Sequence, residues 1–162
     1  MPKRLSADAR QLVLASATEE ARRRGDRWLG TDHLLLGLLH EEGSRAAKSL
    51  GVSLADARAA SDALDVAALA AVGIQTDALG AGPPAPFGRR LPPLTSGARA
   101  VFKRATDEAR PVKGGRIETT HFLLALLSLE PPDPAAELLG ALGIDPVAVR
   151  ERLAGPAGGG AG

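Results

Sequence analysis

Residues 17–39 read ATEEARRRGDRWLGTDHLLLGLL and residues 105–127 read ATDEARPVKGGRIETTHFLLALL, so the chain carries one pattern twice. The two stretches align without a gap at a constant offset of 88 residues. Thr31 matches Thr119, His33 matches His121, and leucines follow each histidine. A gap-free match of this length indicates an internal repeat, which is the first feature that a fold prediction must respect.

Composition and helix-start residues predict that each repeat is a bundle of four helices. Ala and Leu, both strong helix formers, supply 56 of the 162 residues, so the fold class is predicted to be all-α. Ser6 and Thr95 are expected to open the first helix of each repeat, and Thr31 or Asp32 and Thr119 the second. The third and fourth helices are expected to begin at Ser44, Ser53, Asp133 and Asp145.

The predicted organisation is one domain over residues 1–153. Repeat one covers 4–61 and repeat two covers 94–153, with 62–93 between them. Within that connection, 62–79 is expected to form an added helical pair, and the stretch rich in proline and glycine after it a linker. The glycine-rich tail, 154–162, is expected to be disordered.

Charge and composition exclude several functional classes. The net charge of +1 disfavours a dedicated nucleic-acid binder, and the absence of cysteine removes disulfide scaffolds and thiolate metal sites. No apolar run is long enough for a signal peptide or a membrane span, so we expect a cytoplasmic protein that does not bind membranes. No Gly-Lys-Ser/Thr sequence of a P-loop is present, and neighbouring carboxylates on a helix diverge by about 100°, so neither an enzyme nor a cofactor is expected.

The histidines and the helix starts are the candidate functional positions, and each has a structural alternative. His33 and His40 share a helix face, but no third metal ligand is evident, so we expect His33 and His121 to be structural residues that bond the preceding turn. Backbone N–H groups at a helix start can hold an anion, and a carboxylate such as that of Asp32 can hold a guanidinium. Capping alone also explains these hydroxyl residues.

The two copies also resemble a known family. The stretches LGTDHLLLGL (29–38) and IETTHFLLAL (117–126), each followed by Leu-Gly-Val or Leu-Gly-Ile, are similar to the double Clp-N motif of ClpA/ClpC-type AAA+ unfoldases. The similarity covers residues 4–153. It implies two pseudo-twofold-related four-helix repeats without ATPase activity, which recruit substrates and adaptor proteins.

The resemblance also implies candidate ligand residues, because ClpC domains bind phosphorylated arginine in two equivalent pockets. The matching first pocket is Ser6 with Asp32 and neighbouring Thr31. The matching second pocket is Thr95 with Thr120 and neighbouring Thr119. It lacks a carboxylate for the guanidinium, so one working site at most is expected.

We therefore predict a non-catalytic domain that binds peptides or proteins in a groove between its repeats. The expected partners are Clp unfoldase or protease components, their substrates or adaptors. The alternative is a protein that sequesters a small molecule or cyclic-peptide antibiotic and so protects the unfoldase. The sequence leaves open whether residues 62–79 block or extend the groove.

Overall fold

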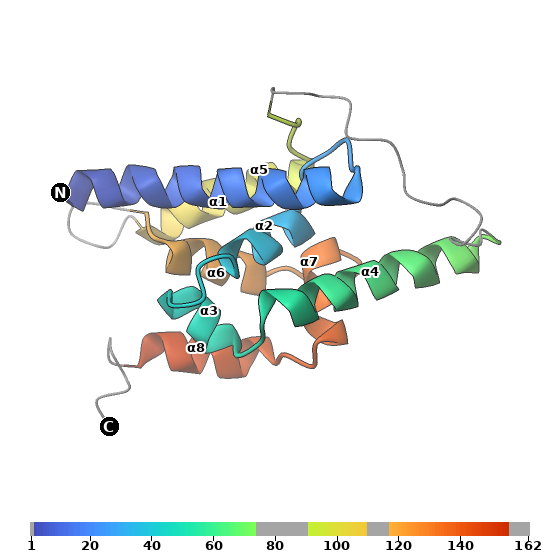
Figure 1. The fold of residues 1–162 in the computed structure, drawn as a ribbon. Coiled ribbons are helices and arrows are strands. Elements are labelled where there is room, and N and C mark those ends of the chain that lie inside the picture. Colours follow the sequence, from blue (N-terminus) through green and yellow to red (C-terminus); the bar gives the residue numbers. More distant parts are fainter. Residues whose placement is uncertain (1, 74–90, 110–116, 156–162) are drawn as a thin grey trace.

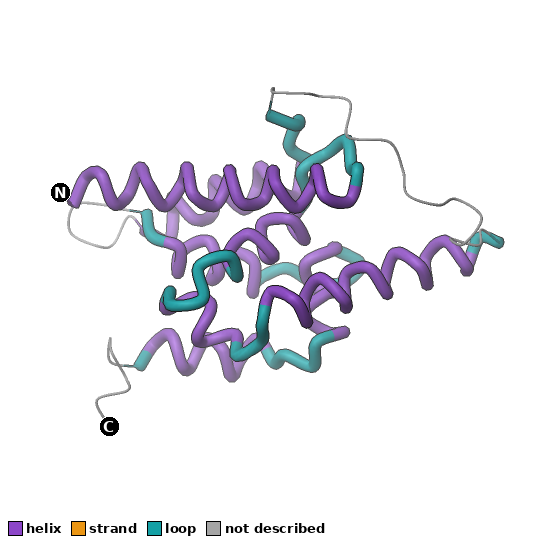
Figure 2. The backbone as a smooth tube through the Cα atoms, viewed as in Figure 1, coloured by secondary structure: helices purple, strands orange, loops and turns teal. Residues whose placement is uncertain are grey.

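The computed structural model describes residues 2–73, 91–109 and 117–155, and within them it contains eight helices and no strand. The all-α prediction is confirmed, and within each described range the helices follow one another through short loops (Figures 1 and 2). None of the helices in these ranges is long and apolar enough to cross a membrane. In chain order the helices are α1 (Pro2–Arg24), α2 (Thr31–Leu38), α3 (Arg45–Leu50), α4 (Leu54–Ala71), α5 (Ser96–Ala109), α6 (Thr119–Leu127), α7 (Pro134–Ala141) and α8 (Pro146–Ala154).

Five of the predicted helix starts are confirmed by side-chain caps. Each cap oxygen accepts a hydrogen bond from a backbone N–H in the first turn, which would otherwise have no partner. These residues are Ser44, Ser53, Thr95, Asp133 and Asp145.

Three predicted capping residues are wrong. Helix α1 already begins at Pro2, so Ser6 lies inside it, and proline is well suited to a first helical position. Helices α2 and α6 are capped at Gly30 and Glu118, which leaves Thr31 and Thr119 as the first helical residues. There the N–H of the capping residue donates to the imidazole three positions later, so the threonine hydroxyl is not needed as a cap.

The core lies where the two Leu-rich helices, α2 and α6, are covered by the long helices α1 and α5 (Figure 1). Gly37 permits the close approach of α2 to α1, because a Cβ at this position would lie 3.0 Å from the backbone nitrogen of Ala17. Phe102 of α5 meets the buried ring of Phe122 edge to face, with 5.1 Å between ring centroids. Helices α1 and α5 therefore cover one continuous apolar core.

The two repeats are joined directly by backbone as well as by side chains. The N–H of Leu29 donates to the carbonyl of Pro93, and the N–H of Thr95 donates to the carbonyl of Leu29. This short parallel bridge places the start of α5 against the start of α2. The helix starts of the two repeats are thus neighbours in space.

The predicted helical pair at 62–79 stays a prediction, because its second half lies largely outside the described residues. Residues 62–71 continue α4 without a break to Ala71, and residues 74–79 lie outside the described residues. The Ala-rich sequence favours this continuation, since it contains no helix breaker before Gly73. Most side chains after Ser61 are exposed, and the helix extends beyond the rest of the bundle (Figure 1).

Candidate functional site

A buried guanidinium organises the end of α1. The side chain of Arg24 is only 10% exposed and contacts three carboxylates, at 2.9 Å from Asp32, at 3.3 Å from Asp26, and at Asp65. It also donates a hydrogen bond of 2.8 Å to the hydroxyl of Ser61. The cluster therefore ties α1, the start of α2 and the middle of α4 together.

The three carboxylates around Arg24 do not have equal environments. Burial raises the pKa of Asp26, but the hydrogen bond from His33 and the charge of Arg24 outweigh it and hold that pKa below its usual value. Burial also raises the pKa of Asp65, and there the neighbouring charges of Asp26 and Asp32 add to the effect against the opposing charge of Arg24. One guanidinium thus compensates the three carboxylates only in part.

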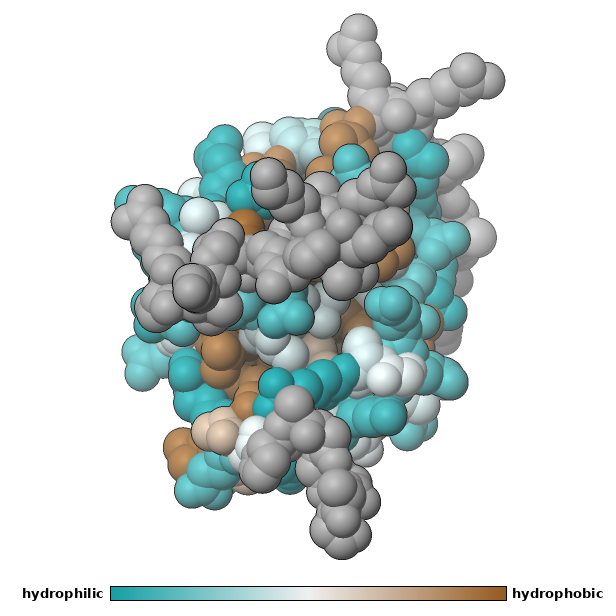
Figure 3. All heavy atoms as spheres, turned by 90° about the vertical axis from the view of Figure 1, so that its left-hand side faces the viewer, coloured by the Kyte–Doolittle hydropathy of each residue, from teal (hydrophilic) through white to brown (hydrophobic). Residues whose placement is uncertain are grey.

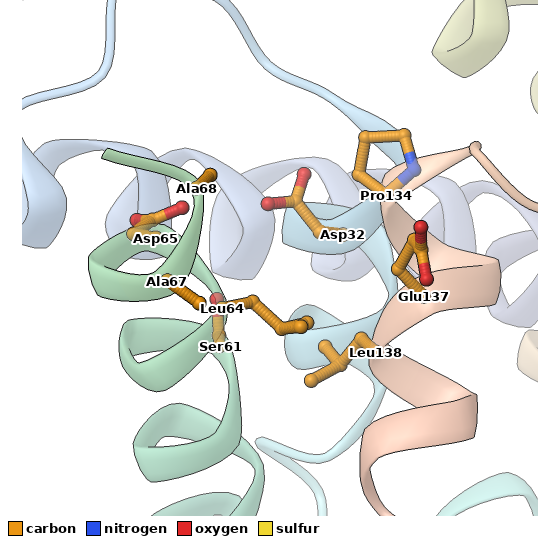
Figure 4. Close-up of a pocket in the computed structure, with 9 residues that line it drawn as sticks. All are labelled: Asp32, Ser61, Leu64, Asp65, Ala67, Ala68, Pro134, Glu137 and Leu138. Atoms are coloured by element: carbon orange, nitrogen blue, oxygen red, sulfur yellow. The ribbon is translucent and has the colours of Figure 1, made fainter. Parts of the chain in front are cut away.

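An open cleft of about 430 Å³ begins at this cluster, and both repeats line it. Asp32 comes from α2, and α7 contributes the opposite wall with Pro134, Glu137 and Leu138 (Figure 4). The remaining wall is α4, with Ser61, Leu64, Asp65, Ala67 and Ala68. The continuation of α4 past residue 61 therefore extends this groove, a question that the sequence left open.

Leu64 and Leu138 extend toward one another across the cleft, and the carboxylates lie around them (Figure 4). Leu138 is 1% exposed and belongs to the core, while Leu64 packs against the core from α4. The cleft thus combines an apolar base with acidic groups from three helices.

The predicted first pocket is not formed as a unit. Ser6 precedes Arg24 by 18 residues of α1, which is about 27 Å along a helix axis, and Arg24 contacts Asp32. Ser6 and Asp32 therefore lie far apart. The predicted pairing failed because it kept each pocket within one repeat, whereas the structure pairs helix starts from different repeats.

Thr95, assigned to the second pocket, lies beside Asp32 instead. A Cβ built on Gly30 would be 2.9 Å from Oδ1 of Asp32 and 3.8 Å from Cγ2 of Thr95. The hydroxyl of Thr95 accepts the N–H of Ala98 as the cap of α5. A hydroxyl of repeat two and a carboxylate of repeat one thus share one corner of the fold.

The remaining threonines have separate surroundings. Thr31 is 1% exposed, and its hydroxyl forms hydrogen bonds with repeat two. It donates to Asp133 at 2.8 Å and accepts from the N–H of Ala135. Thr119 lines a small pocket with Leu12 of α1, about 190 Å³ in volume, and Thr120 follows it in α6. Thr31 is therefore a structural contact rather than an open ligand group.

The histidines bond the preceding turn in both repeats, as the sequence indicated. Nδ1 of His33 accepts the N–H of Gly30 at 2.9 Å, and Nδ1 of His121 accepts the N–H of Glu118 at 2.8 Å. Nε2 of His33 additionally lies 2.7 Å from Asp26. Across the described ranges, no group of three or more acidic or histidine side chains is arranged to hold a metal ion.

Several residues of the cleft carry no sequence signal that would identify them. Arg24 stands out only as part of a basic run at a helix end, which the helix dipole explains. Asp65 and Glu137 belong to helices of different repeats, so no spacing along the chain relates them to Asp32. Only the packing of α4 against α7 reveals that the three carboxylates share a cleft.

Comparison with known proteins identifies the family. The model of the Clp repeat (R) N-terminal domain matches residues 4–130. The chain belongs to this family. Chloroplastic ClpC1 of Oryza sativa subsp. japonica and chloroplastic ClpC of Pisum sativum are each 33% identical to it over 144 residues.

This Clp N-domain matches only a small part of those relatives. The match covers 87% of the chain and 14% of either ClpC protein. The N-terminal domain of the caseinolytic protease associated chaperone ClpD from Arabidopsis thaliana has the same fold. Its TM-score is 0.60 at 20% identity, over 88% of this chain and 93% of that one.

Proposed function

We propose that this Clp N-domain is a non-catalytic domain that binds proteins or peptides and thereby recruits or sequesters substrates or adaptors in Clp-dependent proteolysis in the cytoplasm. Membership of the family supports the proposal. The observation that carries it is the open cleft of about 430 Å³ between α2, α4 and α7, because a groove with an apolar base and a polar rim suits an extended chain.

Binding of an unfolded protein tests this function. We expect fluorescein-labelled β-casein to bind saturably, with a rise in fluorescence anisotropy as the domain is added. The double variant Leu64→Asp, Ala68→Asp places charges on the α4 wall of the cleft and should weaken binding about tenfold or more. Circular dichroism of the variant controls for folding. Absence of β-casein binding by the folded wild-type domain would contradict the proposal.

Phosphoarginine is the finer ligand that we propose, at the corner shared by Asp32 and Thr95. Arg24 shows that the carboxylate of Asp32 accepts a guanidinium, and Thr95 stands at the start of α5, where backbone N–H groups favour an anion. The ligand would have to exchange with Arg24 at Asp32. A single site is expected, since neither Thr119 nor Thr120 supplies a carboxylate.

Calorimetric titration of free phosphoarginine tests this corner. We expect saturable binding near one site that is abolished in Asp32→Asn and weakened in Thr95→Val. Ser6→Ala is the matched hydroxyl control, because Ser6 lies far along α1 from Asp32. Loss of binding in Ser6→Ala with retention in Thr95→Val would reverse the assignment.

The apolar part of the cleft favours one second candidate, a protein that sequesters peptide antibiotics. Five lining residues are apolar, namely Leu64, Ala67, Ala68, Pro134 and Leu138. On the face shown in Figure 3, by contrast, the apolar residues among the described atoms lie in separate small groups. A rise in melting temperature with a cyclic-peptide antibiotic, but not with phosphoarginine, would favour this second function.

A further inference from the structure

The acidic groups of the cleft exceed its internal cation. Asp26, Asp32 and Asp65 contact Arg24, and Glu137 faces the same cleft from α7. Because one guanidinium stands against the three carboxylates that line the cleft, Asp32, Asp65 and Glu137, the cleft keeps a negative potential that an entering cation would compensate.

Glu137 is the carboxylate most available to such a cation. It is exposed, and its side chain makes no hydrogen bond or ion pair with any other residue in the described ranges. Asp65 lies on the opposite wall, and half of its side chain is exposed (Figure 4). Both carboxylates can therefore accept new hydrogen bonds without dismantling the fold.

The base of the cleft suits the stem of a long basic side chain. Leu64 and Leu138 lie between the two walls, and Ala67 and Ala68 leave room above α4 because they are small. Arginine covers apolar surface with its methylene groups while its charged head stays at the polar rim. Val72, four residues after Ala68 and so on the same side of α4, is 72% exposed, which provides an adjoining surface for apolar neighbours of that arginine.

We infer that the cleft between α4 and α7 binds an unmodified arginine side chain of a partner peptide, next to an apolar residue, with its guanidinium between Asp65 and Glu137. This inference rests on the proposed function and names the chemistry of the partner. Arginine is favoured over lysine because its planar fork can engage two carboxylates at once, as Arg24 already does in the same cluster.

Two matched peptides test the inference. The probe is fluorescein-labelled Gly-Ala-Leu-Arg-Ala-Leu-Gly, and its control carries citrulline, the uncharged analogue, in place of arginine. Fluorescence anisotropy is expected to show at least tenfold tighter binding of the arginine peptide. Glu137→Gln should weaken that binding about fivefold to tenfold, and Glu137→Lys more strongly, while the citrulline peptide is unaffected.

Glu151→Gln is the matched control variant, because Glu151 is an exposed carboxylate on α8 that does not line the cleft. Equal affinity for the two peptides, no binding of either, or an equal effect of Glu151→Gln and Glu137→Gln would each overturn the inference. If β-casein still binds to the wild-type domain in any of these cases, the inference alone fails and the proposed function stands. Loss of β-casein binding as well would remove both.

Discussion

The hydroxyl of Thr31 donates a hydrogen bond of 2.8 Å to the carboxylate of Asp133, a residue 102 positions later in the chain. Asp133 in turn caps α7, and the same hydroxyl accepts the N–H of Ala135. The start of a helix in repeat two is therefore held by a side chain of repeat one. This contact fixes α7, one wall of the cleft, relative to α2.

Replacing this hydroxyl is expected to destabilise the domain. Thr31→Val keeps the shape of the side chain but removes both hydrogen bonds, so we expect a loss of about 1–3 kcal/mol in the free energy of unfolding. Thr119→Val, the equivalent change in repeat two, is the control, because Thr119 makes no such contact. Urea unfolding followed by circular dichroism measures both, and equal losses would contradict the assignment.

Glu20 predicts a dependence of stability on pH. Its side chain is fully buried, and hydrogen bonds from Arg58 and His40 outweigh the effect of burial, which alone would raise its pKa, and lower the pKa to about 2. A carboxyl group whose pKa is lowered by folding stabilises the protein at pH values above its pKa in the unfolded chain. The contribution of Glu20 should therefore be lost as the pH falls from about 4.5 toward 2.

Glu20→Gln tests that contribution. Since it removes one partner of a buried ion pair, we expect a loss of about 3 kcal/mol at pH 7. We also expect a smaller decline in stability between pH 4.5 and pH 2 than in the wild type. Glu19→Gln, the exposed neighbour, is the control. A variant whose decline with acid matches that of the wild type would show that Glu20 does not carry the effect.

The close approach of α1 and α2 predicts opposite outcomes for two glycines. A Cβ at Gly37 would press on the backbone of Val13 and Ala17, so Gly37→Ala should cost about 1–3 kcal/mol despite its better helix propensity. Gly140→Ala in α7 meets nothing within 4 Å and should stabilise the domain by about 0.5–1 kcal/mol. Thermal unfolding of the two variants measures the difference, and stabilisation by Gly37→Ala would refute the close contact.

The surplus of carboxylates around Arg24 predicts that one of them is dispensable for stability. The pKa of Asp65 is raised by burial and by its acidic neighbours, so its charged form is less favourable in the folded chain than in the unfolded one. Asp65→Asn should therefore leave stability at pH 7 unchanged or slightly higher. Urea unfolding at pH 7 checks this. A loss of more than about 1 kcal/mol would indicate that the pair with Arg24 dominates.

Much of the fold was predictable because the repeat and its helix-start residues are local signals. Ser53 and Asp145 needed only a cap residue before an amphipathic run. The capping residues of α2 and α6 were missed because histidine at the third helical position accepts the N–H of the capping residue, which a search for hydroxyl caps does not consider.

The candidate site was less predictable because it depends on contacts between the repeats. Asp32 was singled out from its motif, but its neighbours in space are Arg24, Thr95 and Asp65, none of which stands at a telling distance in the sequence. The length of α4 matters as well, since the predicted end of repeat one at residue 61 leaves out the wall that Leu64 and Asp65 provide.

The backbone bridge between Leu29 and Leu94 also has a consequence for synthesis of the chain. Leu29 cannot find its partner until 65 further residues have been translated. At bacterial to eukaryotic elongation rates this delay is about 3 to 13 seconds. During that interval the Leu-rich helix α2 is covered by α1 but lacks its contacts with α5, α6 and α7, so this side of it is exposed to chaperones and to other nascent chains. The order of translation thus gives this small domain a vulnerable period that its finished structure does not reveal.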